Sequence, residues 1–230
     1  MGNSSQPFSY RDLPEPKLPA NDQMFRSWRG LLFLILKTIV RLIYHPRIEG
    51  RSSLANQPYL IIANHRSAWD PLVIMTVLKD VWPDWISKEN LFKRRWLSNI
   101  FIQLGMIPVD RSLQDMQAMR RILTRLSDGR LLGLFPEGTR VRTWQDKIDN
   151  PPKSTYINMA ARRGMKIQAI SIEYRGKFFH STRVRLLEPI DAKAALKQMS
   201  REELNHEIIT RIYASMGEDY PSTFPSEEQR

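Results

Sequence analysis

Residues 59–72, YLIIANHRSAWDPL, join an apolar run to a polar turn and then to a helix start. The run 59–63 is short and apolar, as expected for a buried strand. Asp70 followed by Pro71 is typical of a helix start, with an N-cap residue and then proline at the first helical position. A strand followed closely by a helix is the repeating unit of α/β folds. The rest of the chain decides whether this unit recurs.

Further apolar runs alternate with helical patterns along the chain. We expect strands at 47–50, 84–87, 106–109, 131–135, 167–173 and 183–187 in addition to 59–63. The clearest helix covers 113–126, with Ser112 and Asp115 as a capping box and Gly129 as its stop. The alternation predicts an α/β fold with a mainly parallel sheet of about seven strands flanked by helices.

The composition is that of a globular protein with a strong positive charge. The chain has 230 residues, 42% of them hydrophobic and 26% charged, a formal net charge of +11 and no cysteine. This length suits one large domain, and the lack of cysteine excludes disulfides, thiol catalysis and cysteine metal sites. The charge implies an anionic partner, which could be nucleic acid, anionic lipid, a phosphorylated substrate or an acidic carrier protein.

The N-terminal region divides into two parts. Residues 1–23 are polar and proline-rich, which predicts a mobile arm. The segment 24–44 contains LLFLILKTIVRLIY, which is interrupted by Lys37 and Arg41 and is shorter than the roughly 20 residues that span a bilayer. It predicts an amphipathic helix that docks in a membrane interface, with a buried helix as the alternative. Residues 45–216 then form the main domain, and 217–230 form a tail.

Parallel sheets bind ligands at the carboxyl ends of their strands, so residues that follow strands are the candidate site. His65 follows the strand 59–63, and a neutral imidazole can accept a proton near neutral pH. In a regular helix His65 and Asp70 would point about 140° apart, so only a turn between them can bring them together. Asp70 would then orient the imidazole, or would only cap the helix; its two oxygens could also do both.

A second motif, GMIPVDRS at 105–112, ends another expected strand. Arg111 lies at the carboxyl end of that strand. An arginine there can bind a phosphate through two parallel charge-assisted hydrogen bonds. It can equally form a surface ion pair with the neighbouring Asp110, so the motif alone leaves both readings open.

A third motif, LLGLFPEGTR at 131–140, places a tight turn after an apolar strand. Gly138 allows a close backbone approach, and exposed N–H groups together with Thr139 and Arg140 could hold an oxyanion. Glu137 would repel a phosphate, so its expected role is to orient an arginine or to bind an acceptor hydroxyl.

In this order the three motifs resemble those of the glycerophospholipid acyltransferase superfamily, whose best-known members acylate lysophosphatidic acid to phosphatidic acid. NHRSAWD matches the family's histidine, four residues and aspartate; GMIPVDR matches its second block, and FPEGTR matches its third letter for letter. A fourth block corresponds to IQAISIEY, where Gln168 stands at the expected proline. The aspartate at position 70, where late lipid A acyltransferases carry glutamate, favours the glycerolipid branch. The resemblance covers roughly residues 45–190.

The resemblance implies a reaction without a covalent acyl-enzyme, a metal or a cofactor. His65, oriented by Asp70, would deprotonate a glycerol hydroxyl that attacks the thioester of acyl-CoA or acyl-carrier protein. Arg111 and Arg140 would grip the acceptor's phosphate, and Glu137 would hold Arg140 or the glycerol end. The expected site residues are the catalytic pair His65 and Asp70 and the substrate-binding residues Arg111, Glu137, Gly138, Thr139 and Arg140.

The implied partners are a membrane lipid acceptor, acyl-CoA or acyl-carrier protein, and an anionic membrane surface. Nucleic acid is not expected, because no nucleic-acid-binding motif accompanies the charge. We expect a membrane-associated enzyme on the cytoplasmic face of the inner or cell membrane. Lys88, Lys153 and the basic run 93–95 are weaker binding candidates, with solvated surface positions as the alternative. The competing functions are acylation of another acceptor, such as glycerol 3-phosphate, another lysophospholipid or a lyso-aminolipid, and a non-catalytic basic lipid-binding module.

Overall fold

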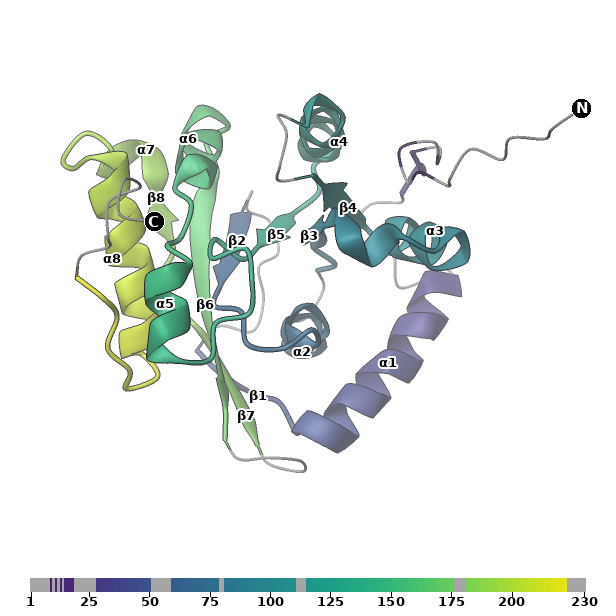
Figure 1. Ribbon diagram of the computed structural model, residues 1–230, viewed down its shortest axis with the longest axis horizontal. Helices are drawn as coiled ribbons and strands as arrows, with labels where there is room; N and C mark the ends of the chain where they lie inside the picture. Colours follow the sequence, from purple (N-terminus) through teal and green to yellow (C-terminus); the bar gives the residue numbers. More distant parts are fainter. Residues whose placement is uncertain are drawn as a thin grey trace, which may run out of the picture.

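A computed structural model of the chain shows an eight-stranded sheet flanked by helices (Figure 1). The structure describes residues 9, 11, 13, 15–18, 28–50, 59–78, 81–110, 115–175 and 181–222. The strands are β1 (Arg47–Glu49), β2 (Tyr59–Ala63), β3 (Asp84–Lys88), β4 (Met106–Val109), β5 (Leu132–Leu134), β6 (Lys166–Tyr174), β7 (Thr182–Leu186) and β8 (Ile190–Asp191). The helices are α1 (Trp28–Tyr44), α2 (Asp70–Val77), η3 (Glu89–Phe92), α3 (Arg95–Gln103), α4 (Met116–Ser127), α5 (Trp144–Asp149), α6 (Thr155–Arg162), α7 (Ala192–Ala195) and α8 (Arg201–Ala214).

The sheet runs in the order β1-β7-β6-β2-β5-β3-β4, and β8 pairs with β6 beside this path. Neighbouring strands are parallel except for β6, which is antiparallel to β7 and β8. The predicted α/β class with a mainly parallel sheet is confirmed, and all seven expected strands form within one or two residues of their predicted ends. The two-residue β8 was not predicted, because so short a strand has no periodicity to detect.

The central strand β2 is buried on both faces. Its side chains alternate between two cores: Tyr59, Ile61 and Ala63 belong to the cluster under α1 and α2, whereas Leu60 and Ile62 belong to the cluster under α4, α6 and α8. This burial explains why the strand reads as a continuous apolar run instead of an alternating one. The carboxyl end of β2 therefore lies at the centre of the sheet, and His65 comes soon after it.

The helix expected at 113–126 is α4, and the capping box predicted for it is wrong. The helix begins at Met116 and its N-cap is Asp115, whose Oδ1 accepts the backbone N–H of Ala118 at 2.9 Å. The other oxygen of Asp115 accepts the N–H of Asp110 at 3.0 Å, which ties the cap to the end of β4. Ser112 lies outside the described residues. Gly129, the predicted stop, follows the helix with a positive φ of 71°.

Helix α1 covers the described part of the segment predicted at 24–44. One side is buried: Phe33 and Val40 lie in the core, and the ring centroids of Phe33 and Trp82 are 4.8 Å apart. Six large apolar side chains of the helix are exposed, namely Trp28, Leu31, Leu34, Ile35, Ile39 and Leu42. Among the helices of the described chain, none has the length and apolar character needed to cross a membrane.

The described residues of the N-terminal arm contact α4 and the end of β4. Glu15 forms ion pairs with Arg121 (2.9 Å) and Arg125 (2.5 Å), and Arg11 pairs with Asp110 at 3.2 Å. Arg121 and Arg125 are almost fully buried, so Glu15 offsets much of the cost of their burial. The described part of the N-terminal arm is therefore bound to α4 and the end of β4, although its composition predicts a mobile segment. Residues 1–8, 10, 12, 14 and 19–23 lie outside the described residues.

Candidate active site

His65 and Asp70 meet at the carboxyl end of β2. His65 lies in the turn after the strand, Asp70 is the first residue of α2, and Asp70 Oδ2 is 2.7 Å from His65 Nδ1. The side chain of His65 is 19% exposed and that of Asp70 is fully buried. The expected contact is therefore present. It leaves Nε2 as the imidazole nitrogen that is not bonded to the aspartate.

The carboxylate of Asp70 points back into the turn and does not cap α2. Its Oδ2 also accepts the backbone N–H groups of Arg66 (2.7 Å) and Ser67 (2.8 Å), and its Oδ1 accepts the phenol of Tyr174 (2.5 Å). The N-cap of α2 is Trp69, which makes no side-chain capping bond. The predicted cap role is wrong, because the oxygen that faces His65 also binds the N–H groups that precede the helix.

The imidazole of His65 stacks on a column of aromatic rings. The ring centroids of His65 and Phe135 are 4.2 Å apart with an interplanar angle of 16°, and Phe135 stacks in turn on Trp85 at 5.0 Å. Trp85 fits because residue 133 is glycine: a Cβ there would lie 2.7 Å from the indole ring. The phenylalanine of FPEGTR and the glycine two positions before it thus determine where the imidazole lies.

Glu137 supports the turn that carries His65. It is only 7% exposed; its Oε2 accepts the backbone N–H of His65 at 3.1 Å, and its Oε1 accepts the hydroxyl of Tyr213 on α8. Burial raises the pKa of Glu137 to about 7. The predicted role of Glu137 in holding Arg140 or an acceptor hydroxyl is not what these contacts indicate, since both carboxylate oxygens bind groups inside the protein.

The other residues of the FPEGTR turn are more accessible. Gly138 has a positive φ of 71°, as a tight turn requires, and Thr139 and Arg140 are exposed. Immediately after the turn, Val141 N–H donates to His65 O at 2.7 Å. The turn therefore presents Thr139 and Arg140 to solvent while its end is bonded to the residue that carries the imidazole.

Arg111 lies outside the described residues, so the predicted convergence of Arg111 with Arg140 stays a prediction. The glycine of the same motif has a structural role. Gly105 has a φ of 91°, and a Cβ at this position would lie 2.2 Å from Asp84 Oδ1. Asp84 is fully buried and pairs with Arg130 at 2.5 Å. The close approach of Gly105 to this buried ion pair excludes any larger residue.

A cavity of about 600 Å³ lies between α4 and α6. Phe135 and Gly138 line it, so it reaches the ring on which the His65 imidazole stacks. Most of its walls are apolar and include Leu134, Met119, Ile122, Leu123 and Met159. Lys153, Arg162 and Arg163 are exposed and line the same cavity. Asp110 and Asp115 line the cavity as well, so its charged lining carries both signs.

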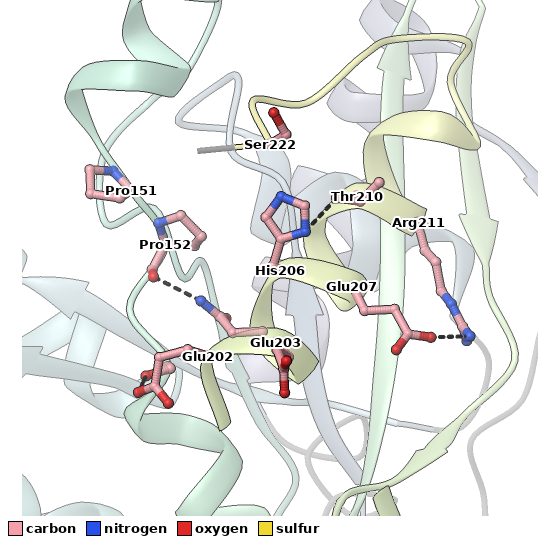
Figure 2. Close-up of a pocket in the computed structure, with 11 residues that line it drawn as sticks. Pro151, Pro152, Glu202, Glu203, His206, Glu207, Thr210, Arg211 and Ser222 are labelled. Carbon is pink, nitrogen blue, oxygen red and sulfur yellow. Dashed lines mark hydrogen bonds and ion pairs between the residues drawn. The ribbon is translucent and has the colours of Figure 1, made fainter. Parts of the chain in front are cut away.

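A second, larger groove of about 710 Å³ lies over α8 (Figure 2). It is lined by Pro151 and Pro152 on one side and by residues of α8 on the other, and Arg211, which also lines it, pairs with Glu207. The carboxylates of Glu202 and Glu203 also face it. None of the described residues of the three motifs lines this groove. Its acidic lining makes it a poor site for an anionic substrate.

Residues near the C-terminus also bind the turn that carries His65. Arg66 pairs with both carboxylate oxygens of Glu218 (2.5 and 2.6 Å), and Lys147 Nζ binds Glu218 Oε2 at 3.1 Å. The ammonium of Lys147 also lies 4.2 Å from the ring centroid of Tyr213. Sequence patterns did not indicate Glu218 or Tyr213. Glu218 lies beyond the boundary predicted at residue 216, so the segment predicted as a tail takes part in these contacts.

No group of three or more histidine, aspartate or glutamate side chains in the described chain is placed to hold a metal ion. Lys88 is exposed at the end of β3, and Lys153 is exposed beside Pro136, whose carbonyl accepts the Lys153 N–H at 3.0 Å. Of the two weaker lysine candidates, Lys153 is therefore the one that lies next to the FPEGTR turn.

Comparison with known proteins gives a consistent picture. The family model described as Acyltransferase matches residues 45–173. The 1-acyl-sn-glycerol-3-phosphate acyltransferase of Bacillus subtilis (strain 168) is 24% identical over 46% of this chain and 53% of its own length. The enzyme of that name from Borreliella burgdorferi is 28% identical over 52% of this chain and 47% of its own length. The chain thus spans about half the length of the curated relatives it matches.

A solved structure has the same fold. The crystal structure of the 1-acyl-sn-glycerophosphate (LPA) acyltransferase from Thermotoga maritima aligns with a TM-score of 0.57 at 19% sequence identity, covering 85% of this chain and 90% of that chain. At this identity the likeness concerns the fold.

Proposed function

Since this chain belongs to the acyltransferase family, we propose that it transfers a fatty acyl group from an acyl thioester to the free hydroxyl of lysophosphatidic acid, which yields phosphatidic acid. The observation that carries the proposal is the 2.7 Å contact between His65 Nδ1 and Asp70 Oδ2 at the carboxyl end of β2. A carboxylate on Nδ1 places the proton there and leaves Nε2 as the base. The apolar cavity beside Phe135 supplies room for a substrate.

In the proposed reaction His65 Nε2 removes the proton of the acceptor hydroxyl as its oxygen attacks the thioester carbonyl carbon. The buried Asp70 stabilises the imidazolium that forms. The C–S bond then breaks, and the imidazolium returns the proton to the departing thiolate. The products are an ester and a free thiol, so no acyl group needs to be held covalently by the protein.

We assign the acceptor's phosphate to the arginines of the second and third motifs. Arg140 is exposed on the turn whose end is bonded to His65 O through Val141, so a phosphate bound to it would lie close to the base. Arg111 would supply the second cation. A two-point charge-assisted clamp on the phosphate would orient the hydroxyl and lower the entropic cost of the reaction.

We assign the donor's acyl chain to the cavity between α4 and α6. Its apolar walls suit a hydrocarbon chain, and Phe135 brings one end of it to the imidazole. Lys153, Arg162 and Arg163 would face the phosphates of coenzyme A or the acidic surface of acyl-carrier protein. Both donors carry negative charge at this end of the thioester, so the proposal includes either one.

We also propose that α1 docks the enzyme on an anionic membrane surface. Leu31, Leu34 and Leu42 are 64%, 58% and 61% exposed, while the opposite side of the helix packs on the core. Lys37 and Arg41 add positive charge to the same helix. A helix with this arrangement lies in the interface with its apolar side chains among the lipids. Placement on the cytoplasmic face remains the prediction made from the sequence.

The test is a panel of acceptors and donors. Thiol release and the mass of the lipid product are measured with lysophosphatidic acid, glycerol 3-phosphate, lysophosphatidylcholine and a lyso-aminolipid, each with acyl-CoA and with acyl-carrier protein. We expect release with lysophosphatidic acid and formation of phosphatidic acid. Faster turnover of another acceptor would assign that acceptor instead. Lipid binding without thiol release for any pair would favour the non-catalytic module.

A further inference from the structure

Tyr174 donates its phenol hydrogen to Asp70 Oδ1 at 2.5 Å. We propose that Tyr174 is a positioning residue of the active site, which holds the Asp70 carboxylate in the orientation that binds His65 Nδ1. The inference rests on the proposed function, in which His65 is the base. Tyr174 is the last residue of β6 and lies just beyond the segment 45–173 that the family model matches.

The two oxygens of Asp70 have different partners. Oδ2 accepts three donors from the turn, namely His65 Nδ1 and the backbone N–H groups of Arg66 and Ser67. Oδ1 faces Tyr174. Because Asp70 is fully buried, no bulk water replaces that hydroxyl when it is lost. Partners on both oxygens fix the plane of the carboxylate, and removing the one on Oδ1 allows the plane to rotate away from His65.

The ring of Tyr174 is itself held by aromatic packing. Tyr44, the last residue of α1, meets Tyr174 edge-on with ring centroids 5.6 Å apart. Tyr44 also packs against Trp69 at 6.4 Å, and Trp69 immediately precedes Asp70. Tyr44 of α1 therefore packs both on the ring that carries the phenol hydroxyl and on Trp69, the residue before Asp70. This packing limits how far the hydroxyl can move from Oδ1.

Tyr174 acts as a hydrogen-bond donor and does not exchange its proton. Burial and the negative charge of Asp70 raise the pKa of Tyr174 above its ordinary value, so the phenol keeps its hydrogen throughout the working range. The other titratable or charged groups around the pair are Glu137, which accepts His65 N–H, Arg66, which pairs with Glu218, and Tyr44. Removal of the Tyr174 hydroxyl changes the charge of none of these groups.

The test is Tyr174→Phe, which removes the hydroxyl and keeps the ring. Without this donor the carboxylate can rotate away from His65 Nδ1, so the imidazolium is stabilised less. We expect the acidic limb of the kcat profile to move to lower pH by about half a unit or more, and kcat to fall by about tenfold with KM for both substrates unchanged. A loss of thermal stability alone, with the wild-type pH profile and kcat, would overturn the proposal.

A matched control is Ser98→Ala. Ser98 is fully buried, and its hydroxyl donates to Phe92 O at 2.7 Å, away from His65. This variant also loses a buried hydroxyl hydrogen bond. We expect it to lower the melting temperature while leaving the pH profile unchanged, which separates a general packing loss from an effect on the pair.

A second measurement does not depend on turnover. The titration of the His65 ring, followed by NMR in the full-length wild type and in Tyr174→Phe, should shift to lower pH in the variant. An unchanged titration would show that Tyr174 does not position the Asp70 carboxylate. If the wild type releases no thiol with any acceptor, the proposed function fails, whereas the His65 titration still decides whether Tyr174 controls the carboxylate.

Discussion

The carboxylate of Glu137 accepts the backbone N–H of His65 at 3.1 Å, and its other oxygen accepts the hydroxyl of Tyr213. A single buried side chain thus joins the FPEGTR turn, the histidine turn and α8. The glutamate of the motif is therefore part of the scaffold of the site. Its unfavourable burial has a consequence that can be measured.

The first prediction concerns stability against pH. Burial raises the pKa of Glu137 from 4.5 to about 7, so between these values the folded protein binds more protons than the unfolded chain. The resulting stabilisation is present below the unfolded pKa and is lost as pH rises towards 7, in total about 3 kcal/mol. Glu137→Gln should flatten this decline in denaturant unfolding measured from pH 4.5 to 7.5. Parallel pH slopes for variant and wild type would contradict it.

The second prediction concerns the catalytic pair. His65→Ala and Asp70→Asn should each lower turnover by roughly 10² to 10⁴-fold, because the general base or its orientation is lost. The control is His206→Ala on α8, another partly buried histidine, whose Nε2 bonds to Pro221 O at 2.9 Å. It should retain thiol release. Wild-type turnover in His65→Ala would show that another group acts as the base.

The third prediction concerns the phosphate clamp. Arg140→Ala and Arg111→Ala should each raise KM for a phosphate-bearing acceptor by roughly ten to a hundredfold, since each would remove a charge-assisted contact. Arg201→Ala is the control, because the Arg201 side chain on α8 is 38% exposed and pairs with the adjacent Glu202 at 2.5 Å. If KM for the acceptor were the same in Arg140→Ala and Arg111→Ala as in Arg201→Ala, the two arginines would not bind the acceptor. The proposed role of His65 would be unaffected.

The fourth prediction compares two glycines with positive φ. Gly105→Ala should destabilise the fold by about 3–5 kcal/mol, because the added Cβ displaces the buried Asp84 from Arg130. Gly129→Ala meets no atom within 4 Å and should cost about 1–2 kcal/mol of backbone strain. Denaturant unfolding measures both. Similar losses in the two variants would show that the Asp84–Arg130 pair tolerates the displacement.

The fifth prediction concerns membrane docking. Replacing Leu31, Leu34 and Leu42 by serine should weaken sedimentation with vesicles of phosphatidylglycerol and phosphatidylcholine, because these exposed side chains would enter the lipid. High salt should also weaken vesicle binding of the wild type, because it screens the attraction between cationic side chains and anionic lipid. Met116→Ser on α4 removes an equally exposed apolar side chain and should leave binding unchanged. Undiminished binding of the triple variant would place the membrane contact elsewhere.

Local patterns were sufficient to predict the strands and the motifs. Tyr59–Ala63 and Met106–Val109 form with their predicted ends, because a short apolar run bounded by turn residues has few alternatives. The contact of His65 with Asp70 was also predictable, since both lie within one strand–turn–helix unit. The cap of α2 and the capping box of α4 were wrong, because several donors compete for each carboxylate and only the folded turn selects among them.

The amino-acid sequence by itself determined the α/β class, the order of the three motifs and the pairing of His65 with Asp70, since each depends on residues close together in the chain. Only the tertiary structure decided that Tyr174 binds Asp70 across 104 positions and that Glu137 binds Tyr213 across 76. Such contacts follow no periodicity. They arise because β6 lies beside β2 and α8 packs against the sheet, which brings a distant tyrosine hydroxyl to each of the two buried carboxylates.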